Sequence, residues 1–219
     1  TRDFLNNAVG LCKERTGFKM KIIAFNGSPK VEGNTHIALG LVLAEIERKG
    51  FETEIINVGS HKIRGCTACR KCAENLDEKC VIGGDDVNLW IQKIKESDGI
   101  LLGSPVYFSG MTGAMKSFLE RAFYVAKFNN NLFRHKVGAS LVSVRRAGGL
   151  PALQQLNVFL SYAEMMIATS NYWSVIYGRD PGEVLQDNEG VQTMETLGRN
   201  MAYMLQLKDA GKHLSVHDK

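Results

Sequence analysis

Short apolar runs alternate with longer amphipathic stretches along this chain of 219 residues. The run KIIAF is apolar and partly β-branched, and comparable runs recur downstream, so each of them predicts a buried strand. Several of the runs are continuously apolar, as is usual when helices cover both faces of a parallel sheet. We expect strands at residues 21–25, 51–58, 99–105, 135–144 and 165–170.

The stretches between these runs have helical periodicity. In the first of them, we expect Asn34 or Thr35 to cap the start of the helix and Gly50 to end it. Helices are expected at residues 36–50, 86–97, 113–126, 150–164 and 188–212. Alternating strands and helices predict an α/β fold, a doubly wound sheet of five parallel strands between two helical layers, in the order 2-1-3-4-5.

No repeat, low-complexity tract or linker divides the chain, so we expect one folded domain. It covers residues 20–212 and contains a cysteine-rich insertion at residues 59–86. Residues 1–19 form an N-terminal extension whose apolar spacing suggests a helix, and residues 213–219 form a tail.

The loops that follow the strands are the candidate binding sites, because doubly wound sheets bind ligands at the carboxyl ends of their strands. The first loop, GSPKVEGNT, opens a helix whose free amides and dipole favour an anion. Ser28, Asn34 and Thr35 supply hydrogen-bonding side chains, and Lys30 supplies positive charge. The loop is neither a Walker A loop nor a GxGxxG fingerprint. It indicates a phosphate site, although an ordinary well-capped turn explains it equally well.

The loops after the third and fourth strands suit a flat ring with an anionic edge. Pro105 ends its strand, Tyr107 and Phe108 follow as an aromatic pair, and Gly110 permits close backbone approach. The sequence RRAGG, which begins at Arg145, adds positive charge after the fourth strand. Taken alone, the loop after the third strand is also explained by aromatic side chains that cover the edge of the core. The loop after the fourth strand is also explained by an ordinary solvent-exposed basic turn. Together with the phosphate loop, they form the pattern of a bound flavin mononucleotide (FMN).

Three segments, GSPKxxGNT, SPVYFSGMTGAMKSFLER and RRAGG, resemble the flavodoxin-like NADPH-dependent FMN reductase family over roughly residues 21–204. The resemblance implies an FMN-dependent oxidoreductase in which the flavin, and no side chain, carries the chemistry. It places the FMN phosphate at the first loop and the isoalloxazine ring along the loop after the third strand. The expected cofactor-binding residues are Ser28, Pro29, Lys30, Asn34, Thr35, Ser104, Pro105, Val106, Tyr107, Phe108, Gly110 and Arg145.

Four of the five cysteines lie within the segment CTACRKCAENLDEKC, with the spacing C-x2-C-x2-C-x7-C. Two-residue gaps let thiolates turn toward one centre, so the run is compatible with a [4Fe–4S] cluster, while zinc and free or redox-active thiols remain alternatives. In the resembled family, this motif is similar to that of the iron–sulfur flavoproteins, homo-oligomers whose cluster passes electrons to FMN. The expected cluster ligands are Cys66, Cys69, Cys72 and Cys80.

Composition and charge narrow the expected location and partners. The net charge is +4 with no block of like charges, which gives little support for nucleic-acid or membrane binding. No apolar stretch approaches the roughly 20 residues of a membrane helix, and the first residues lack the features of a secretory signal. We therefore expect a cytoplasmic protein, whose reducing surroundings argue against a disulfide framework.

The expected function is electron transfer through the cluster to FMN and on to a small-molecule acceptor. A ferredoxin-like protein or NAD(P)H would be the donor. The alternatives are a cluster-free NAD(P)H-dependent FMN or quinone reductase, a non-enzymatic flavodoxin-like carrier, and a four-cysteine zinc-binding interaction module. We also expect a homo-oligomer, a dimer or tetramer, with Trp173 as a core or interface anchor.

Overall fold

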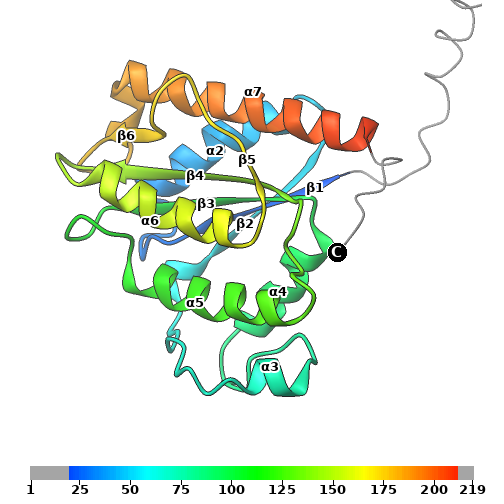
Figure 1. Ribbon diagram of the computed structural model, residues 1–219. Coiled ribbons are helices and arrows are strands. Elements are labelled where there is room, and N and C mark those ends of the chain that lie inside the picture. The colour runs from blue at the N-terminus through cyan, green and yellow to red at the C-terminus, as the bar shows by residue number, and fades with distance from the viewer. Residues whose placement is uncertain (1–19, 212–219) are drawn as a thin grey trace, which may run out of the picture.

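The computed structural model describes residues 20–211, and its central feature is a parallel sheet with the strand order β2-β1-β3-β4-β5 (Figure 1). This order confirms the predicted flavodoxin-like fold class. The strands in chain order are β1 (Lys21–Asn26), β2 (Glu52–Asn57), β3 (Gly99–Pro105), β4 (Val137–Val144), β5 (Met166–Ile167) and β6 (Val175–Tyr177).

The register brings the carboxyl ends of the inner strands together. Asn26, the last residue of β1, pairs with Asn57 of β2 and with Gly103 of β3. Just beyond it, the Gly27 amide donates to the Gly103 carbonyl at 2.7 Å. The loops after β1, β3 and β4 therefore begin at one edge of the sheet.

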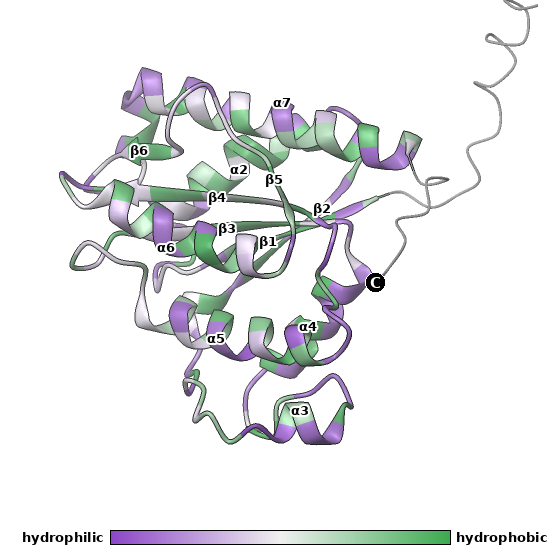
Figure 2. Ribbon diagram, in the orientation of Figure 1, coloured by the Kyte–Doolittle hydropathy of each residue, from purple (hydrophilic) through white to green (hydrophobic). Residues whose placement is uncertain are grey.

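Two helical layers enclose the sheet, and each has its own apolar core (Figure 1). Ile22 and Ala24 of β1 face the layer of α2 and α7, whereas Ile23 and Phe25 face the layer of α4, α5 and α6. The helices carry both hydrophobic and hydrophilic positions, as expected of elements with one covered face (Figure 2). Their bounds are α2 (Asn34–Glu47), α4 (Val87–Glu96), α5 (Gly113–Phe128), α6 (Gly149–Tyr162) and α7 (Asn188–Ala210).

The fifth predicted strand was wrong in its extent. Only Met166 and Ile167 pair with the start of β4, and the chain then leaves the sheet before β6 pairs with the end of β4. The intervening segment carries Tyr172 and Trp173, and Trp173 is 53% exposed, so it is not a core anchor of this chain. Of the other predicted strand residues, Met165 and Ala168 are buried in the core, whereas Thr169 is exposed and Ser170 is partly exposed, so burial there does not require pairing with β4.

The predicted side-chain cap of the first helix was also wrong. Asn34 and Thr35 are the first two residues of α2, and Gly33 occupies the cap position without a side-chain hydrogen bond. The side chains of Asn34 and Thr35 instead contact distant segments, described below.

Four short elements were not predicted, namely strand β6, η1 (Val58–Ser60), α3 (Lys71–Asn75) and η2 (Glu183–Gln186). Within residues 20–211, no helix combines the length and the apolar character needed to cross a membrane. The expected extension at residues 1–19 and the tail at 213–219 lie outside the described residues.

Candidate functional site

A cleft of about 160 Å³ opens where the loops after β1, β3 and β4 meet. Eight of the residues expected to bind a cofactor line it, and five further residues come from the cap of α2, from β4 and from the segment after β6. The expected group is Ser28, Lys30, Asn34, Thr35, Pro105, Val106, Tyr107 and Arg145, and the further group is Gly33, Ser143, Gly178, Arg179 and Pro181.

The start of α2 offers this cleft unpaired backbone donors. The first hydrogen bond of the helix runs from the Ile37 amide to the Gly33 carbonyl at 3.1 Å, so the amides of residues 34–36 have no acceptor within the helix. The first turn of α2 contains no acidic residue. Lys30, Arg145 and Arg179 add three basic side chains to the lining. Free amides, a helix dipole and cations together favour a phosphate dianion.

Three hydroxyl groups are fixed in the cleft by hydrogen bonds. The buried Ser28 Oγ accepts from the Lys30 amide at 3.1 Å, which closes a small turn in the loop. The Thr35 and Ser143 hydroxyl oxygens lie 2.7 Å apart and share a hydrogen bond. A hydroxyl has one donor and two acceptor positions, so each retains capacity for a ligand oxygen.

Asn34 holds a distant segment against the cleft. Its Nδ2 donates to the Asp180 carbonyl at 2.9 Å, and its Oδ1 accepts from the Gly182 amide at 2.8 Å. Both polar atoms of the Asn34 side chain are therefore already hydrogen-bonded. Its role in this structure is to bring the segment that carries Arg179 to the cleft.

The loop after β3 ends in a tight two-residue turn. Tyr107 and Gly110 exchange backbone hydrogen bonds of 2.9 Å, and Phe108 and Ser109 between them have φ values of 48° and 60°. Such left-handed values at non-glycine residues cost energy and often occur at functional sites. The turn leaves the Phe108 ring fully exposed beside the cleft.

Ser104 supports this loop from below. It is buried, and its Oγ accepts from the Thr112 amide at 3.1 Å and donates to the Pro105 carbonyl at 2.9 Å. It does not line the cleft, and neither do Pro29, Phe108 and Gly110.

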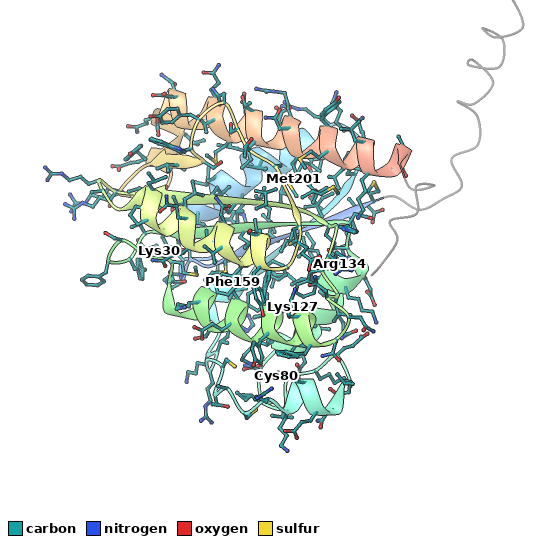
Figure 3. All side chains as sticks on the ribbon, viewed as in Figure 1. Lys30, Cys80, Lys127, Arg134, Phe159 and Met201 are labelled. Carbon is teal, nitrogen blue, oxygen red and sulfur yellow. The ribbon has the colours of Figure 1, made fainter. Side chains whose placement is uncertain are left out.

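The four clustered cysteines line one small pocket of about 10 Å³ on the outer side of α5. Cys66 and Cys69 are exposed, Cys72 is buried, and Cys80 is half-buried. Figure 3 shows Cys80 beyond α5 from the sheet, whereas Lys30 lies at the loop edge of the sheet. Of the ten non-glycine residues with positive φ in the described part of the chain, four lie in this segment: Ala68, Arg70, Leu76 and Glu78. Left-handed backbone conformations are therefore frequent in the cysteine segment.

The electrostatics of the thiols differ with their surroundings. A hydrogen bond from the Lys71 backbone amide lowers the pKa of Cys69. Burial raises the pKa of Cys72, and the neighbouring sulfurs of the other three cysteines raise it further. Within residues 20–211, no three histidine, cysteine, aspartate or glutamate side chains are grouped closely enough to hold a metal ion. The four thiols thus share a pocket without yet forming a ligand set.

Gly59 connects the phosphate loop to the start of the cysteine segment. A Cβ atom on Gly59 would lie 2.3 Å from the Gly27 carbonyl oxygen and 2.3 Å from the Ser28 carbonyl carbon. Only a residue without a side chain permits this approach. The chain after β2 therefore packs directly on the phosphate loop before it reaches Cys66.

Comparison with known proteins identifies the family. The model of the NADPH-dependent FMN reductase family matches residues 20–180. The chain belongs to this family. It is therefore an oxidoreductase of the FMN reductase family, and FMN is the cofactor that membership implies. The basic cleft, with its free helix amides and fixed hydroxyls, fits the phosphate of that cofactor.

Several curated proteins that are similar to this chain are named iron–sulfur flavoproteins. Two iron–sulfur flavoproteins of Methanocaldococcus jannaschii are similar. One is 35% identical, covering 86% of this chain and 98% of its own, and the other is 30% identical, covering 82% and 94%. Among solved structures, RosB superimposes with a TM-score of 0.66 at 14% identity, covering 91% of each chain, which supports the fold alone.

The lining residues that the sequence did not predict come mostly from the segment after β6. Gly178, Arg179 and Pro181 follow the second half of the interrupted edge strand. The sequence GRDPG is the loop that follows strand β6. Loops at the carboxyl ends of strands are the expected ligand sites of this fold, so a prediction of β6 would also have identified this loop.

Proposed function

We propose that this protein binds FMN in the basic cleft and a [4Fe–4S] cluster on Cys66, Cys69, Cys72 and Cys80, and passes electrons between them and a small-molecule acceptor. The observation that carries the proposal is the common pocket of the four cysteines in a chain of the FMN reductase family. The names of the two similar iron–sulfur flavoproteins support it.

The protein's own part in flavin chemistry is binding and orientation. Bound FMN supplies the hydride and electron chemistry. Ser28, Thr35 and the free amides of α2 hold its phosphate, and Lys30 balances the charge. The strained turn from Tyr107 to Gly110 offers backbone groups and aromatic surface to the ring.

The cysteine pocket suits a cluster in the kind and number of its donors. Four soft thiolates are the usual ligands of an iron–sulfur cluster. Because the thiols are not grouped closely enough in this structure, a cluster would require the exposed Cys66 and Cys69 and the buried Cys72 to come closer together. We place the protein in the cytoplasm, where such thiols stay reduced, with NAD(P)H or a ferredoxin-like protein as the electron donor.

Single serine variants of the four cysteines test the cluster assignment. A hydroxyl is a hard and weakly ionised ligand, so each variant should lose iron after anaerobic purification. Each should keep its FMN, because the cleft lies elsewhere. Cys12→Ser, outside the described residues, is the matched control and should keep both. Full iron content in all four variants would refute the assignment.

A cluster-free NAD(P)H-dependent FMN or quinone reductase is the second candidate. The absence of a closely grouped ligand set in residues 20–211 favours it. The two candidates differ in one measurable property, since this second enzyme would turn over NAD(P)H with a quinone at an undiminished rate when all four cysteines are replaced by serine.

A further inference from the structure

A fully buried arginine of α5 lies against the inner side of the cysteine pocket. The side chain of Arg121 is 0% exposed, and that of its partner Asp85 is 7% exposed. The guanidinium donates to both carboxylate oxygens of Asp85, at 2.5 and 3.1 Å. Because a buried arginine needs several partners to offset its lost hydration, its remaining contacts are informative.

The other contacts of Arg121 bracket the cysteine segment. Its Nη1 donates to the Arg64 carbonyl at 3.2 Å, and its Nη2 donates to the Ile82 carbonyl at 2.6 Å. One carbonyl precedes Cys66 by two residues and the other follows Cys80 by two. The guanidinium therefore fastens both ends of the segment to α5.

Arg121 also retains an unused donor at this place. It lines the same pocket as the four cysteines, and its Nε is a buried nitrogen without a hydrogen-bond partner. An arginine guanidinium keeps its charge in proteins, and Asp85 pairs with it here. The side chain is thus a permanent cation that lines the same pocket as Cys80.

We propose that Arg121 is a charge-compensating residue for the group bound by the four cysteines, and that its fixed positive charge sets the reduction potential of that group. The inference rests on the proposed cluster. A cluster on four thiolates is anionic, and reduction by one electron adds a further negative charge. Buried positive charge and hydrogen bonds to the sulfurs stabilise the reduced form and raise the potential.

A purely structural role for Arg121 would predict something different. If the guanidinium only fastens the segment, its loss should loosen the cysteines and release iron, while any cluster that remains should keep its potential. The test must therefore separate the charge from the fastening contacts.

The variant Asp85→Asn provides the background for this separation. It removes the carboxylate charge but keeps an acceptor for the guanidinium, so that a later change at Arg121 leaves no buried anion unpaired. On this background, Arg121→Met removes the cation, and Arg121→Lys keeps it while losing the planar fork. Both double variants lose the simultaneous guanidinium contacts with the two carbonyls, and only the lysine variant keeps the positive charge.

The experiment is an anaerobic redox titration of the reconstituted parent and the three variants, with iron and FMN content measured on each sample. FMN content reports whether each variant is folded. We expect the cluster midpoint potential of D85N/R121M to be more negative than that of D85N/R121K.

Three results would overturn the inference. Equal midpoint potentials in the two double variants would show that the cation does not tune the cluster. Iron loss from both double variants, with retention in D85N, would show a fastening role only. A reconstituted parent without iron would refute the proposed cluster itself, and this failure is recognised in the parent before any variant is compared.

Discussion

Lys136 is a buried amine whose charge should make the stability of the protein depend on pH. Its Nζ donates to the carbonyls of Lys95 at 2.8 Å and Ser97 at 2.5 Å. Burial and the nearby charge of Lys208 lower its pKa to about 8, although the charge of Asp98 partly offsets them. An unfolded lysine has a pKa of about 10.4. Between these values the unfolded chain binds more protons than the folded one, so stability should rise with pH across that window.

The gain should reach at most about 3 kcal/mol, since each unit of pKa difference corresponds to about 1.4 kcal/mol. Urea unfolding at several pH values from 7.5 to about 10 measures it. Lys136→Met is the control, because other lysines and tyrosines titrate in the same range. The same rise in the variant as in the parent would show that Lys136 is not its source.

Ser28 and Thr35 are the residues on which the phosphate assignment depends most. Both side chains are buried at the cleft and already positioned by hydrogen bonds. Replacing both with alanine should remove charge-assisted hydrogen bonds of about 1.5–3 kcal/mol each, so FMN affinity should fall at least roughly tenfold. Fluorescence titration of the apoprotein with FMN measures this, and unchanged affinity would refute the phosphate site.

At the scale of elements, the contact of Gly59 with the phosphate loop gives a prediction that depends on backbone packing. Gly59→Ala would place Cβ 2.3 Å from the Gly27 carbonyl oxygen, so the phosphate loop must shift and FMN should bind more weakly. We also expect a loss of stability of about 1–3 kcal/mol, the usual cost of overpacking.

Gly40→Ala is the matched control. Gly40 lies within α2, and an added Cβ would meet no atom within 4 Å. That variant should gain about 0.5–1 kcal/mol from helix propensity and bind FMN normally. If Gly59→Ala also binds FMN normally, the loop after β2 does not help to shape the phosphate site.

The sequence predicted elements well where local signals agree. Strand β3 was predicted with its full extent, because its continuous apolar run ends at a proline. The edge strand was mispredicted because it is interrupted at residues 168–174. Only the start and the end of β4 have a pairing partner on this side, and no local sequence pattern shows this. The prediction of the helix cap was wrong for the same reason, because the Asn34 side chain forms hydrogen bonds with residues almost 150 positions away.

The residues of the candidate sites also fall into those with a local sequence signal and those without one. The loop after β1 and the four cysteines were selected from spacing and residue type, and the structure places them at a cleft and in one pocket. Arg179 was not, because it reaches the cleft through the missed strand β6. Arg121 was not either, because an amphipathic pattern does not reveal that one charged position of α5 is buried beside Asp85.

At the scale of the whole molecule, an apolar groove of about 320 Å³ lies between α5 and α6. It is lined by Phe123, Tyr124, Val158, Phe159 and Tyr162, with Cys66 and Glu120. Val158 is 65% exposed and Tyr162 is 46% exposed. Contiguous exposed apolar surface of this kind often marks an interface. We propose that a second copy of the chain covers this face in a homo-oligomer.

Val158→Glu should dissociate this oligomer, because the interface would bury an unpaired carboxylate. Light scattering coupled to size-exclusion chromatography measures the mass. Leu207→Glu is the control, since Leu207 is 53% exposed on α7 in the opposite layer. A monomeric parent, or an oligomer that survives Val158→Glu, would contradict the proposed interface.

The central claim is that one chain of this family holds both a flavin and an iron–sulfur cluster. The most direct test is the amount of FMN, iron and acid-labile sulfide per chain in protein purified and reconstituted without oxygen. We predict about one FMN, four iron atoms and four sulfides per chain, with flavin absorption bands above a broad cluster absorption. One FMN per chain with no iron or sulfide after reconstitution would contradict the account and leave a cluster-free FMN reductase.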